Sequence, residues 1–126
     1  ERDFAEYSGI TPLQFHGPVA QGQLADAFRS GSVLVLPSLE EGFGLVVPQA
    51  LACGLPVIVS NRVGAKDLVR QRENGSVVPV QDPVALAEEL QWWADNPRRV
   101  REDVTWKKPV ELLLSHSRSA MRNART

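Results

Sequence analysis

Short apolar runs alternate along the chain with segments whose apolar residues recur every three or four positions. The runs typical of β-strands are LQFHG, SVLVLP, PVIVS and NGSVVPV, at residues 13–17, 32–37, 56–60 and 74–80. Continuous apolar runs such as SVLVLP and PVIVS are typical of strands buried on both faces of a parallel sheet. The alternation predicts an α/β fold, with a Rossmann-like parallel sheet and flanking helices.

Helices are expected between these strands. The segments are GQLADAFRSG, LVVPQALACG, GAKDLVRQ and DPVALAEELQWWADNP, at residues 22–31, 45–54, 64–71 and 82–97. Pro48 forces the second helix to begin close to Gly44, because proline fits only a first turn. In the last segment Asp82 is the expected N-cap and Pro83 the first helical residue. Its predicted buried stripe is Leu86, Leu90, Trp93 and Ala94. A further short helix is expected from Asn96-Pro97.

The composition is that of one soluble globular domain, with 126 residues, 43% hydrophobic and 23% charged. No apolar run approaches the roughly 18 residues that span a bilayer. The lone Cys53 excludes an internal disulfide and fits a reducing compartment, so a cytoplasmic location is expected. His16 and His116 have no partners at metal-ligand spacing, so no metal site is predicted. Because the chain does not begin with Met, we expect it to be part of a longer one.

Charge is unevenly distributed along the chain. Residues 1–97 carry six basic and twelve acidic side chains, whereas residues 98–126 carry eight basic and three acidic ones. A basic segment can bind nucleic acid or an anionic membrane face. The end of this one lacks interleaved aromatic residues and an apolar stripe, so no nucleic-acid partner is predicted. We interpret residues 111–126 as a solvated basic tail, helical or disordered, with at most weak contact with a membrane surface.

The loop SLEEGFG lies between the second apolar run and the next helix. In an open parallel sheet, ligands bind outside the carboxyl ends of the strands, where this loop is expected. Gly42 and Gly44 can adopt positive φ and leave the backbone open to a ligand, and the helix start after them is a natural phosphate seat. Glu41 would repel phosphate but accepts hydrogen bonds from hydroxyl groups. Together these features suggest a sugar phosphate or a nucleotide sugar.

Gln49 is the one polar side chain in an otherwise apolar helix. A buried amide without partners costs roughly 1–3 kcal/mol, so Gln49 should meet either a ligand hydroxyl or a loop backbone group. The sequence leaves both options open, and the two glycines of GFG could equally be turn residues. A dinucleotide fingerprint is excluded, because Val47 stands where that motif needs a third Gly or Ala.

These motifs resemble the C-terminal half of a retaining GT-B glycosyltransferase of the group-1 class (family 4). The matching blocks are FHGPVAQGQLADAFRSGSVLVLPS, EGFGLVVPQALACGLPVIVS and ENGSVVPVQDPVALAEEL, which cover most of residues 13–97. The resemblance implies that residues 1–110 form a partial C-terminal glycosyltransferase domain. Its donor, a UDP-, GDP- or ADP-sugar, would lie in a cleft against an N-terminal acceptor domain that is absent from this sequence.

The resemblance also implies roles for individual residues. Glu41 matches the first Glu of the family's Glu-x7-Glu motif, which holds hydroxyls of the transferred sugar, and is the residue expected to act in catalysis. Gln49 stands at the second Glu, which binds the ribose. The segment expected to face the sugar and diphosphate is Gly42, Phe43, Gly44, Leu45 and Val46. His16 and Gly17 are weaker candidates for contact with the base.

The family transfers its sugar with retained configuration and without a bound metal or cofactor, so the protein's task would be positioning and charge stabilisation. The basic clamp on the diphosphate would lie before residue 1. Two other interpretations stay open. The chain could belong to a GT-B sugar-nucleotide epimerase, or it could be a degenerate domain that binds a nucleotide sugar without turnover.

Overall fold

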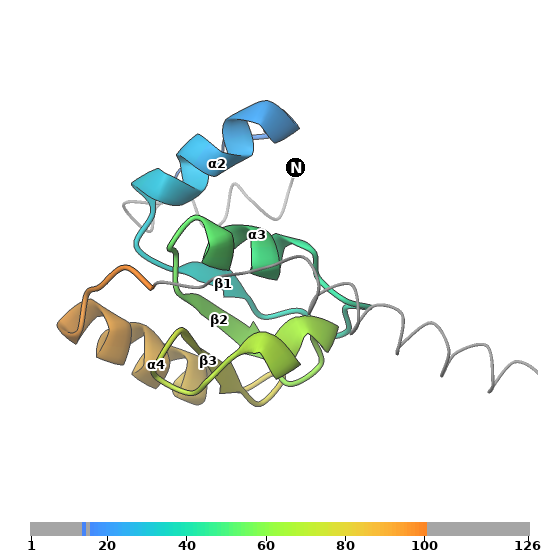
Figure 1. The fold of residues 1–126 in the computed structure, drawn as a ribbon. Coiled ribbons are helices and arrows are strands. Elements are labelled where there is room, and N and C mark those ends of the chain that lie inside the picture. Colours follow the sequence, from blue (N-terminus) through green and yellow to red (C-terminus); the bar gives the residue numbers. More distant parts are fainter. Residues whose placement is uncertain (1–13, 15, 101–126) are drawn as a thin grey trace, which may run out of the picture.

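A parallel sheet of three short strands forms the centre of this chain (Figure 1), of which the computed structural model describes residues 14 and 16–100. The strands are β1 (Leu34–Leu36), β2 (Val57–Ser60) and β3 (Gly75–Val78), in the order β1-β2-β3. Leu34 aligns with Val57, which aligns with Gly75 on the other side. The α/β prediction is therefore confirmed. The strand expected at residues 13–17 is wrong for the described part of that stretch, which forms no strand.

The helices confirm most of the predicted boundaries. They are α2 (Gln21–Ser30), α3 (Val46–Ala52), a short 3-10 helix (Gly64–Leu68) and α4 (Pro83–Asp95). Pro48 lies in the first turn of α3, and Asp82 caps α4 by accepting a hydrogen bond of 3.0 Å from the Ala85 N–H. The helix expected from Asn96-Pro97 is absent from residues 97–100. There the chain instead turns back, and the Val100 N–H donates to the Gly54 carbonyl at 3.0 Å.

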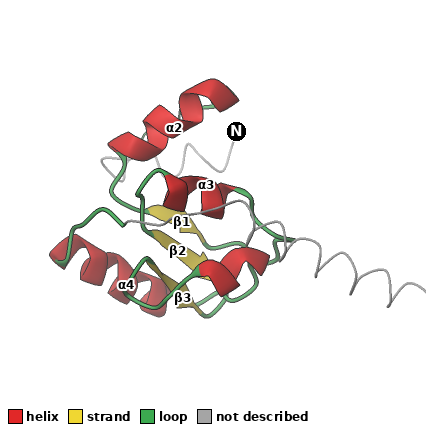
Figure 2. Cartoon of the chain, viewed as in Figure 1, coloured by secondary structure: helices red, strands yellow, loops and turns green. Residues whose placement is uncertain are grey.

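Strand β2 separates two layers of helices (Figure 2). Val57 and Val59 belong to the apolar cluster that includes α3, whereas Ile58 faces the opposite side and packs with Trp93 of α4. All four β2 residues are buried, as predicted for a strand covered on both faces. Strand β1 is only half-buried, against prediction, because β2 is the only strand of the described residues that pairs with it.

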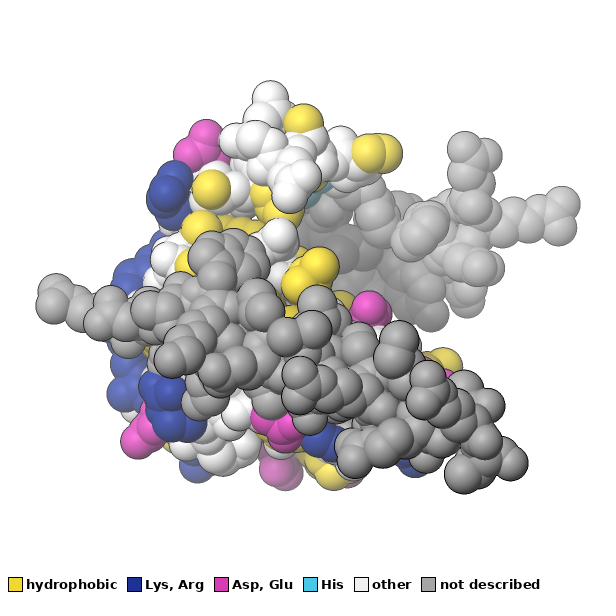
Figure 3. Space-filling model, turned by 45° about the vertical axis from the view of Figure 1, so that its right-hand side comes forward, with side chains coloured by type: hydrophobic (Ala, Val, Ile, Leu, Met, Phe, Trp, Pro, Cys, Tyr) yellow, Lys and Arg dark blue, Asp and Glu magenta, His cyan; other side chains and the backbone are white. Residues whose placement is uncertain are grey.

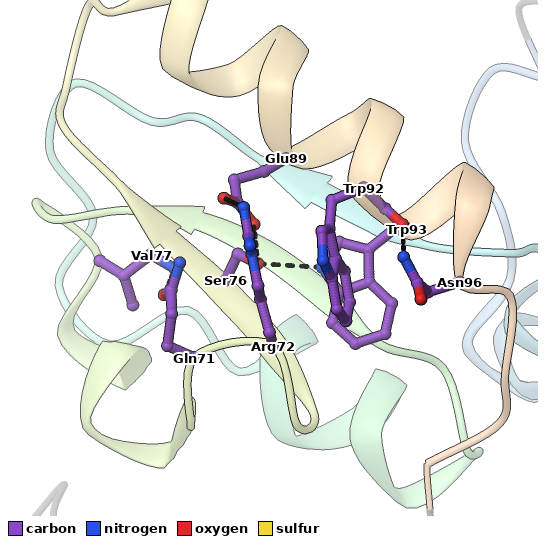
Figure 4. Close-up of polar contacts among 8 residues, drawn as sticks. All are labelled: Gln71, Arg72, Ser76, Val77, Glu89, Trp92, Trp93 and Asn96. Carbon is purple, nitrogen blue, oxygen red and sulfur yellow. Dashed lines mark hydrogen bonds and ion pairs between the residues drawn. The ribbon is translucent and has the colours of Figure 1, made fainter.

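The buried face of α4 differs from the predicted stripe. Trp93 is buried, but Leu90 is 38% exposed and Ala94 is exposed, whereas Glu89 is only 8% exposed. Figure 4 shows what Glu89 meets: the Ser76 hydroxyl donates to its carboxylate at 2.6 Å, and Arg72 forms an ion pair with it at 3.0 Å. The Trp93 indole N–H donates to the same Ser76 hydroxyl at 2.9 Å. A buried carboxylate thus fixes α4 against β3, which the apolar pattern alone did not indicate.

Glu89 gives the fold a pH dependence. Burial raises its pKa, but the hydrogen bonds from Arg72 and Ser76 and the charge of Arg72 outweigh burial, so the pKa lies below the ordinary value of 4.5. A depressed carboxylate pKa stabilises the folded state above the unfolded pKa, and this stability is lost as pH falls through the folded pKa.

We therefore expect Glu89→Gln to lower the free energy of unfolding by about 1–2 kcal/mol at pH 7, since it leaves a half-exposed Arg72 without its ionic partner. Urea unfolding of both proteins at pH 7 and pH 3 measures the difference. The gap should shrink at pH 3, because the unfolded state takes up a proton at the ordinary carboxyl pKa of 4.5 and the stabilisation declines as pH falls below it. A gap that stays constant or widens at low pH would contradict this role.

Candidate functional site: the carboxyl edge of the sheet

The loops that follow β1 and β2 lie side by side at the carboxyl edge of the sheet. Glu41 and Val63 form an isolated parallel bridge. The Glu41 N–H donates to the Arg62 carbonyl at 3.2 Å, and the Gly64 N–H donates to the Glu41 carbonyl at 3.2 Å. The Ala65 N–H then donates to the Phe43 carbonyl at 2.7 Å. Two residues of the loop after β1, Glu41 and Phe43, are thereby fixed to the next loop through backbone groups, which leaves the exposed Glu41 side chain free for a ligand.

Glycine has a different purpose at each position of this loop pair. Gly44 has φ of 84°, and an added Cβ would lie 3.2 Å from the Val63 Cγ1 atom. Gly42 does not use the positive φ that glycine allows, but it has open space where a Cβ would be. Gly64, which the sequence analysis missed, has to be glycine because a Cβ would lie 2.0 Å from the Gly42 carbonyl oxygen.

The side chains of the loop divide between solvent and core. Glu41 is exposed, and its carboxylate has no hydrogen bond or ion pair with any residue that the structure describes. Phe43 is 7% exposed and belongs to the core, so only its backbone can face a ligand. Leu45 is 53% exposed, and Val46 is half-buried against the core. The chemistry offered at this edge is a solvent-facing carboxylate beside backbone groups.

The start of α3 offers hydrogen-bond donors next to Glu41. No side chain caps this helix, and within the described residues the N–H groups of Leu45 and Val46 have no acceptor. The Val47 N–H is used internally, since it donates to the Gly44 carbonyl at 3.0 Å. Unpaired N–H groups at a helix start carry partial positive charge, so they favour an anion.

Gln49 lies one turn further along α3 and is half-buried. Its backbone N–H donates to the Leu45 carbonyl at 3.3 Å, but its side-chain amide has no partner among the described residues. The sequence left two partners open for this amide, a ligand hydroxyl or a loop backbone group. The described residues contain no hydrogen bond from it to a loop backbone group. The amide is therefore available to a ligand.

A second feature of this edge is a cavity of about 240 Å³ that lies between the ends of the three strands and the start of α4. Its lining is mainly apolar and includes Leu39, Val78, Pro79, Pro83 and Leu86. The Ser60 hydroxyl, which also lines it, donates to the Ser38 carbonyl at 2.6 Å and so joins the end of β2 to the loop after β1. This cavity was not predicted from the sequence, because its walls come from three separate segments, at residues 37–39, 60 and 78–86.

The sequence of residues 2–96 matches the family described as glycosyl transferases, group 1. The chain belongs to this family. Among curated relatives, it is 47% identical over 85 residues to the D-inositol 3-phosphate glycosyltransferase of Streptomyces coelicolor, a match that covers 68% of this chain and 19% of the relative. The D-inositol 3-phosphate glycosyltransferase 1 of Catenulispora acidiphila is 33% identical over 118 residues, covering 86% of this chain and 28% of the relative.

A solved structure supports the same assignment. The sucrose-phosphate synthase of Thermosynechococcus elongatus superposes with a TM-score of 0.70 at 38% sequence identity, covering 76% of this chain and 24% of that one. The described sheet is therefore part of a GT-B glycosyltransferase domain. The chain spans about a fifth of the length of the Streptomyces relative.

Within this glycosyltransferase domain the structure brings Glu41 to Val46 and Gln49 together around the start of α3. His16 and Gly17 are exposed and lie outside any helix or strand, and no hydrogen bond joins them to the other candidates. Their contact with a base stays a prediction. In the described part of the chain, no group of three His, Cys, Asp or Glu side chains could hold a metal ion, and no helix is long and apolar enough to cross a membrane.

The two glycines of this loop provide a matched test of its geometry. We expect Gly44→Ala to lower the free energy of unfolding by about 1–2 kcal/mol, because alanine is strained at positive φ. Gly42→Ala should change it by less than about 0.5 kcal/mol, since the added methyl group meets open space. Urea unfolding monitored by circular dichroism measures both. Equal losses in the two variants would show that the backbone of this loop is not held as described.

Proposed function

We propose that this chain is the donor-binding part of a retaining glycosyltransferase, which takes a sugar from a UDP-, GDP- or ADP-sugar and transfers it to an acceptor held by a separate N-terminal domain. One observation carries the proposal: in a domain of this family, Glu41 is fixed through its backbone at the carboxyl edge of the sheet, and its exposed carboxylate has no partner among residues 14 and 16–100. Rigid placement of a polar group at this edge is what orientation of a substrate requires.

In this proposal Glu41 binds the sugar of the donor, and the loop after it binds the diphosphate. The Glu41 carboxylate accepts hydrogen bonds from hydroxyls of the transferred sugar, and such charge-assisted bonds are roughly twice as strong as neutral ones. The free N–H groups of Leu45 and Val46 face the diphosphate, on which negative charge grows as the sugar leaves. Gly42, which has open space where a Cβ would be, keeps this approach clear of side chains, and the backbones of Phe43 and Gly44 complete it.

Gln49 binds the ribose in this proposal. Its unpartnered amide can both donate to and accept from a ribose hydroxyl, though without the ionic strengthening of a carboxylate. His16 and Gly17 would approach the base. The transfer uses no bound metal or cofactor, and the remaining charge on the diphosphate would be stabilised by basic groups outside this chain. We place the reaction in the cytoplasm, with at most weak membrane contact through the basic residues 98–126.

The first test removes the sugar-binding carboxylate. Calorimetric titration of the chain with UDP-, GDP- and ADP-glucose identifies the donor, and we expect Glu41→Ala to weaken that donor by about tenfold or more. Binding of the matching nucleoside diphosphate should hardly change, because it lacks the hydroxyls of the transferred sugar. Glu40→Ala, which removes the neighbouring exposed carboxylate, is the matched control and should leave both affinities unchanged. Absence of binding heat with all three donors would contradict the proposal, and so would equal losses of affinity for the nucleotide sugar and for the nucleoside diphosphate in Glu41→Ala.

The second test changes the ribose contact. We expect Gln49→Glu to strengthen binding of the nucleoside diphosphate and of the nucleotide sugar by the same factor, about fivefold. The reason is that a carboxylate accepts stronger hydrogen bonds and that both ligands contain the ribose. Gln49→Ala should weaken both. The same calorimetric titrations measure these changes. A Gln49→Glu effect confined to the nucleotide sugar would place this side chain at the transferred sugar instead.

A further inference from the structure

A cavity of about 600 Å³ lies at the opposite edge of the sheet, before the start of β1 and beside the end of α4. Its apolar floor is formed by Val33, Leu90, Trp93 and Ala94, and Arg98 and Arg99 lie at its wall. Figure 3 shows Lys and Arg side chains gathered along one side of the molecule. The cavity lies at the amino end of β1, whereas the proposed donor site lies at the carboxyl edge of the sheet, so the two are far apart in the fold.

Both arginines are held in place by the protein. Arg98 donates to the Arg72 carbonyl, and its guanidinium lies 5.6 Å from the Trp92 ring centroid and 5.3 Å from that of Trp93. Arg99 donates to the Arg29 carbonyl in the last turn of α2. The two guanidinium groups are therefore anchored to different segments, and little side-chain entropy remains to be lost when a ligand binds.

Neither guanidinium is neutralised. Within the described residues Arg98 and Arg99 have no carboxylate in ion-pair range, whereas their neighbours do: Arg29 pairs with Asp26 at 3.3 Å and Arg72 with Glu89 at 3.0 Å. Those two pairs leave the charge of Arg98 and Arg99 uncompensated at the cavity. The end of α4 carries only about half a negative charge, so it compensates a fraction of the two positive charges.

We propose that this cavity binds a phosphate monoester. The planar guanidinium donors of Arg98 and Arg99 match the geometry of a phosphate group, and the apolar floor takes the organic part of the ester. The combination selects an amphiphilic phosphate over inorganic phosphate. The ester reaches the cavity either as a soluble molecule or as the headgroup of a phosphate lipid, since both present the same group.

Calorimetry on the full 126-residue chain in phosphate-free buffer tests this assignment. We expect butyl phosphate to bind more tightly than inorganic phosphate, and the double change Arg98→Gln/Arg99→Gln to weaken butyl phosphate by about tenfold or more. The control Arg62→Gln/Arg70→Gln removes the same two positive charges from arginines that do not line the cavity, and it should leave the affinity unchanged. An equal loss in this control would show attraction by net charge only and would overturn the proposal.

Sedimentation with vesicles distinguishes the two sources of the ester. If the source is a lipid, the chain sediments with vesicles of phosphatidylcholine and phosphatidic acid, and the double arginine variant does not. If the source is soluble, butyl phosphate binds and both proteins remain in the supernatant. Absence of binding to butyl phosphate and to vesicles alike would overturn the proposal.

A second variant keeps the proposal testable if the double arginine variant does not unfold cooperatively. Ala94→Phe fills the cavity from an exposed position without altering any charge. We expect it to weaken butyl phosphate severalfold and to leave inorganic phosphate nearly unchanged, because only the organic part loses its place. If Ala94→Phe leaves both affinities unaltered, the ester does not occupy the cavity.

Discussion

The parallel pairing of β2 with a strand on each side determines where the functional groups of this chain lie. Because β2 is buried on both faces, its register with β1 brings the two following loops to one edge, where Glu41 and Val63 form a bridge. The loop contacts are backbone hydrogen bonds, and the close approach at Gly64 leaves no room for a side chain. The donor loop is thus held by backbone hydrogen bonds that continue those of the sheet, and they fix the point from which the Glu41 side chain projects.

The two edges of the sheet carry opposite chemistry. At the carboxyl edge a carboxylate lies beside backbone N–H groups, none of which has a partner in the described part of the chain, a combination that suits hydroxyls and a diphosphate. At the amino edge two guanidinium groups flank an apolar cavity, and no carboxylate of residues 16–100 pairs with them. Glu89 positions part of the amino edge. Its ion pair with Arg72 fixes α4 near β3, and Trp92 and Trp93 at the end of α4 contact Arg98.

Local patterns in the sequence predicted the elements whose causes are local. The Asp82 cap, the first-turn proline of α3 and the buried strand at residues 57–60 all depend on neighbouring residues, and all are confirmed. The failures depend on distant contacts. Glu89 is buried because its partners Ser76 and Arg72 lie 13 and 17 residues away, and hydropathy assigned its place on α4 to Leu90.

The same reasoning explains what the sequence indicated about the site. The loop SLEEGFG and Gln49 were found because they are one short segment with unusual residues, but the different conformations of Gly42 and Gly44 follow from pairing with the loop after β2. The cavity at Arg99 was missed because residues 31–33 and residues 90–99, which line it together, are far apart in the sequence.

The most direct test of the central claim is an NMR titration of this chain with the nucleotide sugar that it binds, in which assigned backbone amides report the position of the ligand. The account predicts that the largest shift changes fall on Gly42 to Val46, on Gln49 and on the adjoining Gly64, all at the carboxyl edge. Changes confined to the Arg98 and Arg99 edge, or absent from residues 41–49 at saturation, would contradict it.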